Sequence, residues 1–453
     1  MTSASMPIPG ERHTADVDVR DRADLYRQIK LIVVSVLAVG LLVYFWLSTA
    51  NPHVLFGARQ SAGGWFGNGG PSKAPKNVDI TPIQIVCIAL AVVVLVLSVL
   101  NRVPKGWKGA IVYVVLGAAF FVGLYLWVFV DQPAGGVQVT VVEPFTQGIH
   151  YATPMVLGAL AGCLCERSGV INIAIEGQLL LGAFLSAAVA TLASHVSGMP
   201  EQLGSMLGML GGILGGVAIS ALLALFAIRY QVNQVVVGVV LTAFATGLTA
   251  FFYGQLRGNQ SANSWLNNPV LLNPVGIPGL DKIPFIGKIL FHQTVVVYVM
   301  YVAIVGVWFL LYQTRWGLRA RSTGEHPTAA DTVGIKVNRM RWQAVLLGGV
   351  VAGLGGAALT IGDTGPFQQD MSAGKGFIAL AAVIMGRWHP IWATLCALFF
   401  GMMVSLEVQF NTVLPAETYL FTAMPYIAVI IAVAGFLGRS RPPAADGEPY
   451  VKQ

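Results

Sequence analysis

Residues 316 to 342 read WGLRARSTGEHPTAADTVGIKVNRMRW, a polar and basic stretch in a chain that is otherwise mostly apolar. An apolar run flanks it on each side, at 295–311 and at 344–361. This arrangement predicts a loop between two membrane spans. Lys and Arg crowd against the ends of the two runs, and an excess of these residues in a short loop is typical of the cytoplasmic side. We therefore expect the loop to face the cytosol.

Composition places the whole chain in the membrane class. Of its 453 residues, 55% are hydrophobic and only 10% are charged, and the mean hydropathy is +0.70; both are typical of polytopic membrane proteins. The net charge of +7 is explained by basic residues at span ends, where they set orientation and meet anionic membrane lipid. No nucleic-acid partner is implied.

The apolar runs predict an all-α polytopic membrane protein of about 10–12 transmembrane segments, since one span needs ~20 apolar residues. We divide the chain into a cytosolic polar tail (1–30), an N-terminal extension of three spans (31–150), a core (151–437) that contains the loop 314–342, and a second cytosolic tail (438–453). The first thirty residues contain no apolar core of a signal peptide, so the first span is expected to direct insertion.

Two pairs of apolar segments in the core are interrupted. Met155 to Cys165 is only eleven residues long, ends in Glu-Arg-Ser-Gly, and is followed by a longer run. Phe377 to Met385 is also short, and Gly386 to Pro390 separates it from the next run. Two broken or re-entrant helix pairs, one in each half, are typical of an internally duplicated transporter with a substrate site near the membrane midplane.

Within the basic loop, local signals predict a short helix outside the membrane. Thr323 can cap it, Pro327 suits its first turn, Ala329 and Ala330 favour helix, and Gly334 can adopt the left-handed geometry that ends one. The alternative is an ordinary solvated charged loop.

The loop resembles a known one. Its signature, Gly324-Glu325-His326-Pro327-x-Ala329-Ala330-Asp331-x-x-Gly334, is similar to the cytoplasmic coupling loop of permease subunits in ATP-binding cassette (ABC) importers. In that family the short helix sits in a groove of the ATPase subunit and passes its closing motion to the spans. The resemblance implies that these eight residues form the contact with an ATPase.

Two further motifs narrow the resemblance. The segment ERSGVINIAIEGQ (166–178) and the segment from Gly374 to Pro390 are similar to shared segments of the nucleoside and simple-sugar branch within the branched-chain amino acid and ribose-type permease superfamily. Together the three motifs cover roughly 151–437. The resemblance implies an extracytoplasmic lipoprotein binding protein, a second, paralogous permease with a homodimer as the alternative, and a multi-pass location in the bacterial plasma membrane. The charge pattern at the span ends predicts that both termini lie in the cytosol.

Five residues are candidates for the substrate path: Asn172, Glu176, Gln178, Phe367 and Gln368. A carboxylate such as Glu176 inside an apolar run costs ~2.5–3.5 kcal/mol on insertion scales, so it should face the bundle or a wet cavity. There it either meets the solute or ties the broken helix to a neighbouring backbone or to Arg167. Phe367 can stack on a flat ligand, although an aromatic at a span end is also a common interfacial anchor.

Catalytic and metal-binding groupings are not predicted. A phosphate-cradling loop needs G-x-x-x-x-G-K-[ST], and the nearest fragment, Ser372 to Gly376, lacks the final Ser or Thr. We therefore expect no enzyme activity, no cofactor on this chain, and ATP with its magnesium on a partner ATPase. The four cysteines lie in apolar runs, so neither a disulfide nor a metal site is assigned.

The predicted function is the permease subunit of an ABC importer for nucleosides, with simple sugars as the alternative. A secondary transporter driven by an ion gradient would need several buried charged residues along its spans, and Glu176 is the chief one found. A membrane-embedded enzyme would need His and acidic residues clustered at one membrane face, and the sequence shows no such cluster.

Overall fold

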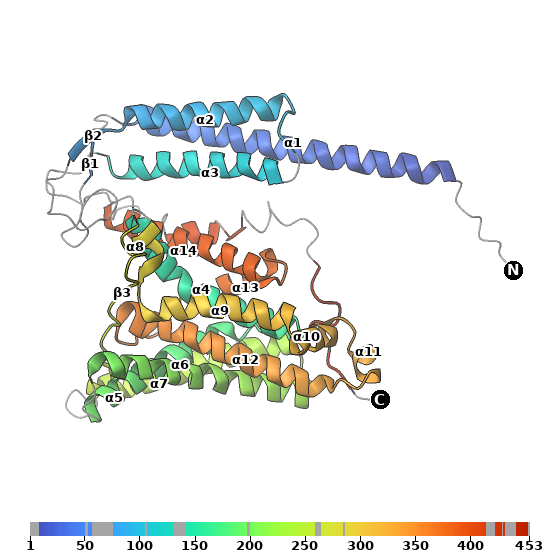
Figure 1. The fold of residues 1–453 in the computed structure, drawn as a ribbon, viewed down its shortest axis with the longest axis vertical. Helices are drawn as coiled ribbons and strands as arrows, with labels where there is room; N and C mark the ends of the chain where they lie inside the picture. The colour runs from blue at the N-terminus through green and yellow to red at the C-terminus, as the bar shows by residue number, and fades with distance from the viewer. Residues whose placement is uncertain are drawn as a thin grey trace. The chain divides into compact units, whose positions relative to one another are not determined.

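The computed structural model describes residues 9–49, 53–56, 76–104, 107–130, 142–196, 200–258, 264–283, 286–413, 422–427, 429–430 and 441–451. The chain is an all-α polytopic membrane protein (Figure 1). Within these residues, ten helices are long and apolar enough to cross a membrane, by length and composition. Within the described residues, the strands are two short antiparallel pairs, β1 (His53–Phe56) with β2 (Lys76–Asp79) and β3 (Val275–Gly276) with β4 (His292–Gln293).

Contacts divide the described residues into two compact units, one up to residue 130 and one from residue 142. The first unit contains α1 (Pro9–Leu47), α2 (Thr81–Val99) and α3 (Trp107–Val128). Its core is a seam of aliphatic and aromatic side chains, in which Phe45 stacks on Trp127 with ring centroids 4.8 Å apart. The helix α1 also extends beyond the first predicted span into the polar tail, because Pro9 suits a first turn and no other proline follows before Leu47.

The second unit contains the remaining helices. Those of the core are α4 (Glu143–Glu166), α5 (Ile175–Val196), α6 (Glu201–Ala224), α7 (Gln234–Gly258), α9 (Val295–Gln313), α12 (Val337–Ala357), α13 (Lys375–Met385) and α14 (Pro390–Val413). A π-helical turn continues α6 (Leu225–Arg229), and another continues α12 (Ala358–Thr364). The loop between α7 and α9 carries a 3-10 turn (Ser264–Asn267) and α8 (Ile286–Phe291).

Glycines let α6 and α12 pack at close range in the middle of this unit. A Cβ atom built on Gly216 would lie 2.6 Å from the Cα atom of Gly353, closer than real Cβ contacts. Close backbone approach at small residues is a common basis of helix association in membranes, where no hydrophobic effect drives helices together. The centre of the core therefore depends on glycine at these positions.

The first interrupted pair differs from its prediction in one respect: α4 is a full-length helix of 24 residues. Polar residues before Met155 made the apolar segment look short in the sequence. In the structure they form the first turns of α4. The Thr146 hydroxyl donates to the Val142 carbonyl (3.1 Å), and Gln147 Nε2 donates to Glu143 Oε1 (3.1 Å). The break itself is present and lies between Glu166 and Ile175.

The second interrupted pair agrees with its prediction. The helix α13 has only eleven residues and ends at Gly386, and α14 begins at Pro390. Between them, Arg387 and Trp388 have positive φ angles of 53° and 55°. Such backbone is uncommon for residues other than glycine, so the surrounding contacts must hold this break in place.

The basic loop contains two helices, α10 (Arg315–Glu325) and α11 (Pro327–Thr332), where a single one beginning at Thr323 was expected. Thr323 does not cap a helix but is buried near the end of α10. The reason is Pro327, which disfavours helical backbone at His326 and starts the next helix. Gly334 has a φ of 84°, as predicted for a helix stop. The predicted last span, 419–437, lies mostly outside the described residues.

Candidate functional site

Arg167 connects the two helix breaks. Its Nε donates to the Trp388 carbonyl (2.9 Å), and its Nη2 donates to the Arg387 carbonyl (3.1 Å). These carbonyls belong to the strained break between α13 and α14, just beyond the end of α13. A guanidinium is suited to this contact because its N–H groups form a rigid planar fork. The second break is therefore held by a side chain from the first.

Glu166 forms a second link between the same breaks. Trp388 Nε1 donates to Glu166 Oε2, and both side chains are buried. A hydrogen bond to a carboxylate is stronger than one between neutral groups. Two adjacent residues of the 166–178 motif, Glu166 and Arg167, thus bind two adjacent residues of the 374–390 motif.

The end of α10 lies against the first break. The Thr323 hydroxyl lies within hydrogen-bonding distance of the Ala320 carbonyl of its own helix (2.7 Å) and of the Ser168 carbonyl (3.3 Å). Gly324 is buried, and a Cβ atom on it would lie 2.9 Å from the carbonyl carbon of Arg167. Arg167 Nη1 also lies 3.8 Å from Glu325 Oε1, a partly exposed ion pair. The three sequence motifs therefore meet at one place, which we call the motif junction: residues 166–169, 323–325 and 386–388.

The other residues of the loop signature differ in exposure. Ala330 is buried, Pro327 and Asp331 are half-buried, and His326, Ala329 and Gly334 are exposed. A groove of about 800 Å³ lies beside them, between α10 and the start of α12. It is lined by exposed apolar side chains and by cations, namely Leu318, Val333, Arg319, Lys336 and Arg339 among others. This surface has the mixed apolar and charged character of a protein interface.

Glu176 holds the start of α13. Its Oε1 accepts the Gly374 N–H (2.8 Å), and its Oε2 accepts the Gly376 N–H (2.6 Å). A carboxylate at a helix N-terminus satisfies N–H groups that have no partner inside the helix and is favoured by the helix dipole. The side chain is 5% exposed. Of the two alternatives for Glu176, this geometry is that of a tie to a neighbouring backbone.

Asn172 and Gln178 pair with each other. Asn172 Nδ2 donates to Gln178 Oε1 (3.1 Å), and Gln178 Nε2 donates back to Asn172 Oδ1 (3.3 Å) and to Ser220 Oγ (2.8 Å). Both amides are fully buried. Their hydrogen-bonding groups are therefore occupied within the protein in this conformation.

Phe367 lies in an aromatic cluster and Gln368 on the surface. The Phe367 ring packs edge-on against Phe184 and Tyr253, with centroids 5.2 and 5.8 Å away. Asn267 bonds both the N–H (2.7 Å) and the carbonyl (2.9 Å) of the same residue. Phe367 is thus fixed on both its side chain and its backbone, whereas Gln368 is exposed.

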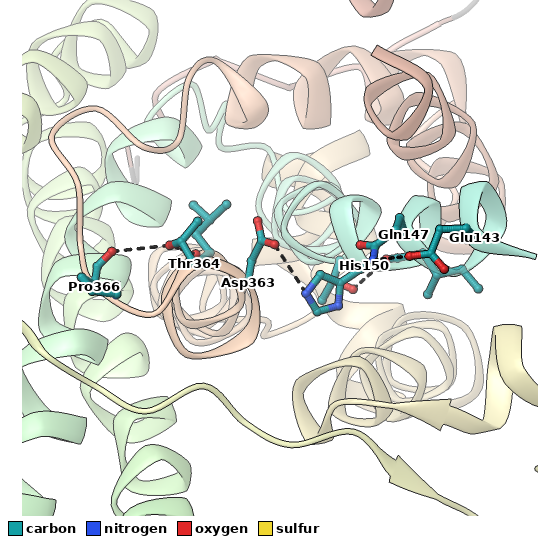
Figure 2. A network of polar contacts seen from close by, with 9 residues as sticks. Glu143, Gln147, His150, Asp363, Thr364 and Pro366 are labelled. Carbon is teal, nitrogen blue, oxygen red and sulfur yellow. Dashed lines mark hydrogen bonds and ion pairs between the residues drawn. The ribbon is translucent and has the colours of Figure 1, made fainter. Parts of the chain in front are cut away.

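A polar network lies toward the end of the core opposite the motif junction. Figure 2 shows His150 of α4 facing Asp363 of the π-helical turn after α12, with Nε2 and Oδ1 3.7 Å apart. Their side chains are 17% and 29% exposed. Glu143 and Gln147 continue the network along α4. These two ionisable groups are more accessible than Asn172, Glu176 and Gln178.

Sequence reasoning missed His150 and Asp363. His150 is the last residue of the range 31–150 assigned to the N-terminal extension, because the polar start of α4 does not predict a span. Asp363 was passed over because it follows the apolar run 344–361 by two residues. An available signal was the general one that ionisable residues within or next to spans are costly and face the protein interior.

Comparisons with known proteins agree with the motifs. The chain is 38% identical to the guanosine ABC transporter permease protein NupQ of Bacillus subtilis over 322 residues, 69% of this chain and 97% of that protein. It is 38% identical to the nucleoside ABC transporter permease protein NupC of Lactococcus lactis over 67% of this chain and 94% of that protein. It is 32% identical to the putative glucose ABC transporter permease protein TsgC13 of Haloferax volcanii over 58% of this chain and 75% of that protein.

No solved structure matches this chain. Residues 145–433 match the family described as "Branched-chain amino acid transport system / permease component". This range contains all three motifs and begins just after the first unit ends. The match covers more than half of the chain, and the chain covers nearly all of NupQ. The protein therefore belongs to this family of transport permeases.

Proposed function

We propose that this chain is the membrane-spanning permease subunit of an ABC importer that takes up nucleosides. The observation that carries the proposal is that the two relatives named for guanosine and nucleoside transport align over 97% and 94% of their own lengths. Simple sugars are the second candidate, favoured by the similarity to the glucose permease protein TsgC13.

ATP hydrolysis is assigned to a partner. The sequence contains no G-x-x-x-x-G-K-[ST] phosphate loop, so ATP and magnesium would be bound by a separate ATPase subunit. The groove beside α11 supports docking of such a subunit, since it offers exposed apolar side chains among cations. The contact residues would be the accessible members of the loop signature, since Gly324 and Ala330 are buried within this chain; they are Glu325, His326, Pro327, Ala329, Asp331 and Gly334.

The motif junction supports a way for motion to reach the spans. A displacement of α10 would move the first break through Thr323 and Gly324. Arg167 would pass it to the second break. Both broken helices would respond together, which suits alternating access around a midplane site. The ATPase can shift this equilibrium only if its ATP-bound and ATP-free states contact the loop differently.

Two further partners follow from the relatives. A lipoprotein binding protein would deliver the solute to the face opposite the motif junction. A paralogous second permease is supported by Bacillus subtilis, in which NupQ and NupP are both guanosine permease proteins and both are similar to this chain, NupP at 24% identity. A homodimer is the alternative assembly.

The solute path is proposed to begin at the accessible polar groups. His150, Asp363 and Gln368 would meet the solute first, because their side chains retain exposure. Asn172, Glu176, Gln178 and Phe367 would line or shape the deeper path, and would be exposed only when the broken helices move. The protein would lie in a bacterial plasma membrane with both termini in the cytosol, as the basic loops indicate.

The test is uptake of radiolabelled guanosine, uridine, adenosine and ribose into cells with and without the gene, repeated after ATP depletion with ion gradients clamped. Loss of ATP-dependent nucleoside uptake alone would support the proposal. Loss of ribose uptake alone would move the assignment to sugars. Uptake that survives ATP depletion but collapses with the gradient would refute the ABC mechanism.

A further inference from the structure

The C-terminal segment Arg441–Val451 lies on the basic loop, although it is distant in sequence. The Ala445 N–H donates to the Gly324 carbonyl (2.8 Å), and the Ala444 N–H donates to Glu325 Oε2 (3.3 Å). The first bond satisfies a carbonyl that the end of α10 leaves free. The segment therefore acts as an external cap on the helix that contacts the motif junction.

A buried arginine ties the same segment to α12. Arg341 is 2% exposed. Its Nη1 donates to the Glu448 carbonyl (2.6 Å), and its Nη2 reaches the carbonyls of Thr323 (3.3 Å) and Ala445 (3.5 Å). A buried charge is costly unless its hydrogen bonds are satisfied. Since two of these carbonyls belong to the C-terminal segment, Arg341 depends on that segment being in place.

The end of the segment reaches α11. Tyr450 is 9% exposed and packs against Ala330 and Val337. On the way, Gly447 passes over the first break with a φ of 80°, and a Cβ atom there would lie 2.7 Å from Ile171 Cδ1. One short segment thus touches α10, α11, α12 and the first break.

Without this segment, the direct contact between the loop and the first break is thin. Among the described residues, the contacts found there are the Thr323 hydroxyl near the Ser168 carbonyl (3.3 Å), the backbone approach of Gly324, and a partly exposed ion pair at Glu325. Exposed ion pairs contribute little because water screens them. The C-terminal segment adds the hydrogen bond of Ala445 to the loop and the hydrogen bonds of Arg341, and it packs Gly447 against Ile171 at the first break.

We propose that Arg441–Val451 is a strap that positions the basic loop on the first break, so that movement imposed on α11 is transmitted to the broken helices instead of being lost in the loop. The inference rests on the proposed function, because it assumes an ATPase that moves the loop. It assigns a working role in transport to a segment outside the family match, which ends at residue 433.

The experiment uses the complete transporter in proteoliposomes, and it measures nucleoside transported per ATP hydrolysed. A chain ending at residue 440 is compared with the full chain and with a matched control that ends at Val451 and lacks only the last two residues. We expect the control to match the full chain. We expect the chain without the strap to bind the ATPase and hydrolyse ATP while the transport ratio falls by about fivefold or more, the range of measured couplings between sites.

Point variants keep the test informative if the shortened chain fails to assemble. Ala445→Pro removes the N–H that bonds Gly324, and Tyr450→Ala removes the contact with α11; both should lower the ratio. Val451→Ala is the control, because the Val451 side chain belongs to the same segment and is exposed. Addition of the peptide 441–453 to the shortened chain should restore the ratio.

The outcomes separate the two proposals. If the full chain shows no ATP-driven nucleoside transport, the proposed function fails. If the full chain transports nucleoside and the shortened chain keeps the same ratio of transport to hydrolysis, the strap is refuted and the proposed function stands. If the shortened chain does not assemble, an unchanged ratio in both Ala445→Pro and Tyr450→Ala refutes the strap in the same way.

Discussion

At the scale of single residues, the ion pair of Glu325 and Arg167 gives the sharpest test of the motif junction. Glu325→Lys places a cation next to Arg167, whose other N–H groups hold the second break. Repulsion would push α10 away from the first break. We expect ATP-driven uptake to fall by about fivefold or more while the protein remains inserted, as measured by uptake and by the amount in isolated membranes.

The matched variant for this test is Glu325→Gln, which keeps the size of the side chain and removes its charge. Because a partly exposed ion pair is worth ~0–1 kcal/mol, Glu325→Gln should lower uptake far less than Glu325→Lys. Unchanged uptake in Glu325→Lys would count against a coupling role for this end of α10.

Glu176 tests whether the buried carboxylate is a structural cap. A glutamine has one acceptor oxygen, so Glu176→Gln would leave one of the two glycine N–H groups facing an NH2 group. Leaving a buried donor unsatisfied costs ~1–3 kcal/mol. We expect a lower unfolding temperature of the purified protein, together with reduced uptake.

Glu201→Gln makes the same chemical change at an exposed position at the start of α6. It should leave the unfolding temperature and the uptake unchanged. If Glu176→Gln abolished uptake without lowering the unfolding temperature, the carboxylate would instead act on the solute.

Asp446 in the strap gives a prediction of pH dependence. Burial raises the pKa of Asp446 to about 8, the charge of Glu166 adds to this, and Arg341 opposes it. Since the carboxyl ordinarily titrates at 3.8, docking of the strap favours the protonated form. Docking should therefore weaken as the pH rises from 3.8 to about 8 and change little above that.

Hydrogen exchange of the Ala445 amide at pH 6 and pH 8, corrected for the intrinsic rate, measures strap docking. The native protein should lose protection at the higher pH. Asp446→Asn carries no charge to bury, so it should keep its protection at both values. Equal loss in the native protein and in Asp446→Asn would assign the dependence to another group.

At the scale of elements, the contact between α6 and α12 depends on bare backbone. Gly216→Ala puts a methyl group where the Cα of Gly353 lies 2.6 Å away. The two helices would have to separate, and overpacking of this kind costs ~1–3 kcal/mol. We expect a lower unfolding temperature in detergent.

Gly247→Ala in α7 is the control, since nothing lies within 4 Å of the added methyl group and alanine favours helix. If both alanine variants unfolded at the native temperature, the close approach of α6 and α12 would not limit stability.

At the scale of the whole molecule, the division into two units predicts that the core transports without the complete first unit. The family match begins at residue 145, beyond the described residues of the first unit. Removal of residues 1–99 deletes two spans and retains α3 together with the basic turn before it, which contains Arg102 and Lys105, so the orientation of α4 is preserved. We expect most of the nucleoside uptake to remain.

The measurement is uptake normalised to the amount of protein in the membrane. Removal of residues 1–106, which takes away the basic turn as well, tests whether that turn sets the orientation. Complete loss of uptake with normal insertion of the chain lacking 1–99 would show that the first unit takes part in transport.

Much of the fold was predictable because membrane spans are local in sequence. In lipid, the backbone N–H and C=O groups of a helix must form hydrogen bonds within that helix. An apolar run of sufficient length therefore specifies a span without reference to its neighbours. The predicted length of α4 was wrong. Its first turns are polar, and the side chains of Thr146 and Gln147 form hydrogen bonds within the helix. Hydropathy alone counts such residues as loop.

The candidate site was predictable only in part. The sequence identified the three motifs, but it did not indicate that they touch. Arg167 and its carbonyl partners are 220 and 221 residues apart, and Glu176 is about 200 residues from the glycines it holds. Roles for Asn172, Gln178 and Phe367 in the path stay predictions, since in this conformation their polar groups or rings are occupied by protein.

The sequence by itself determined the membrane class, most of the spans, the three motifs and the helix stop at Gly334, because each follows from composition or from backbone preferences within a few residues. Only the tertiary structure decided that Arg167 joins the two breaks, that Glu176 caps α13, and that the C-terminal segment lies on the loop. These contacts join residues about 100 to 220 positions apart. No local pattern specifies them, since they depend on how the packed helices bring distant polar groups within hydrogen-bonding reach.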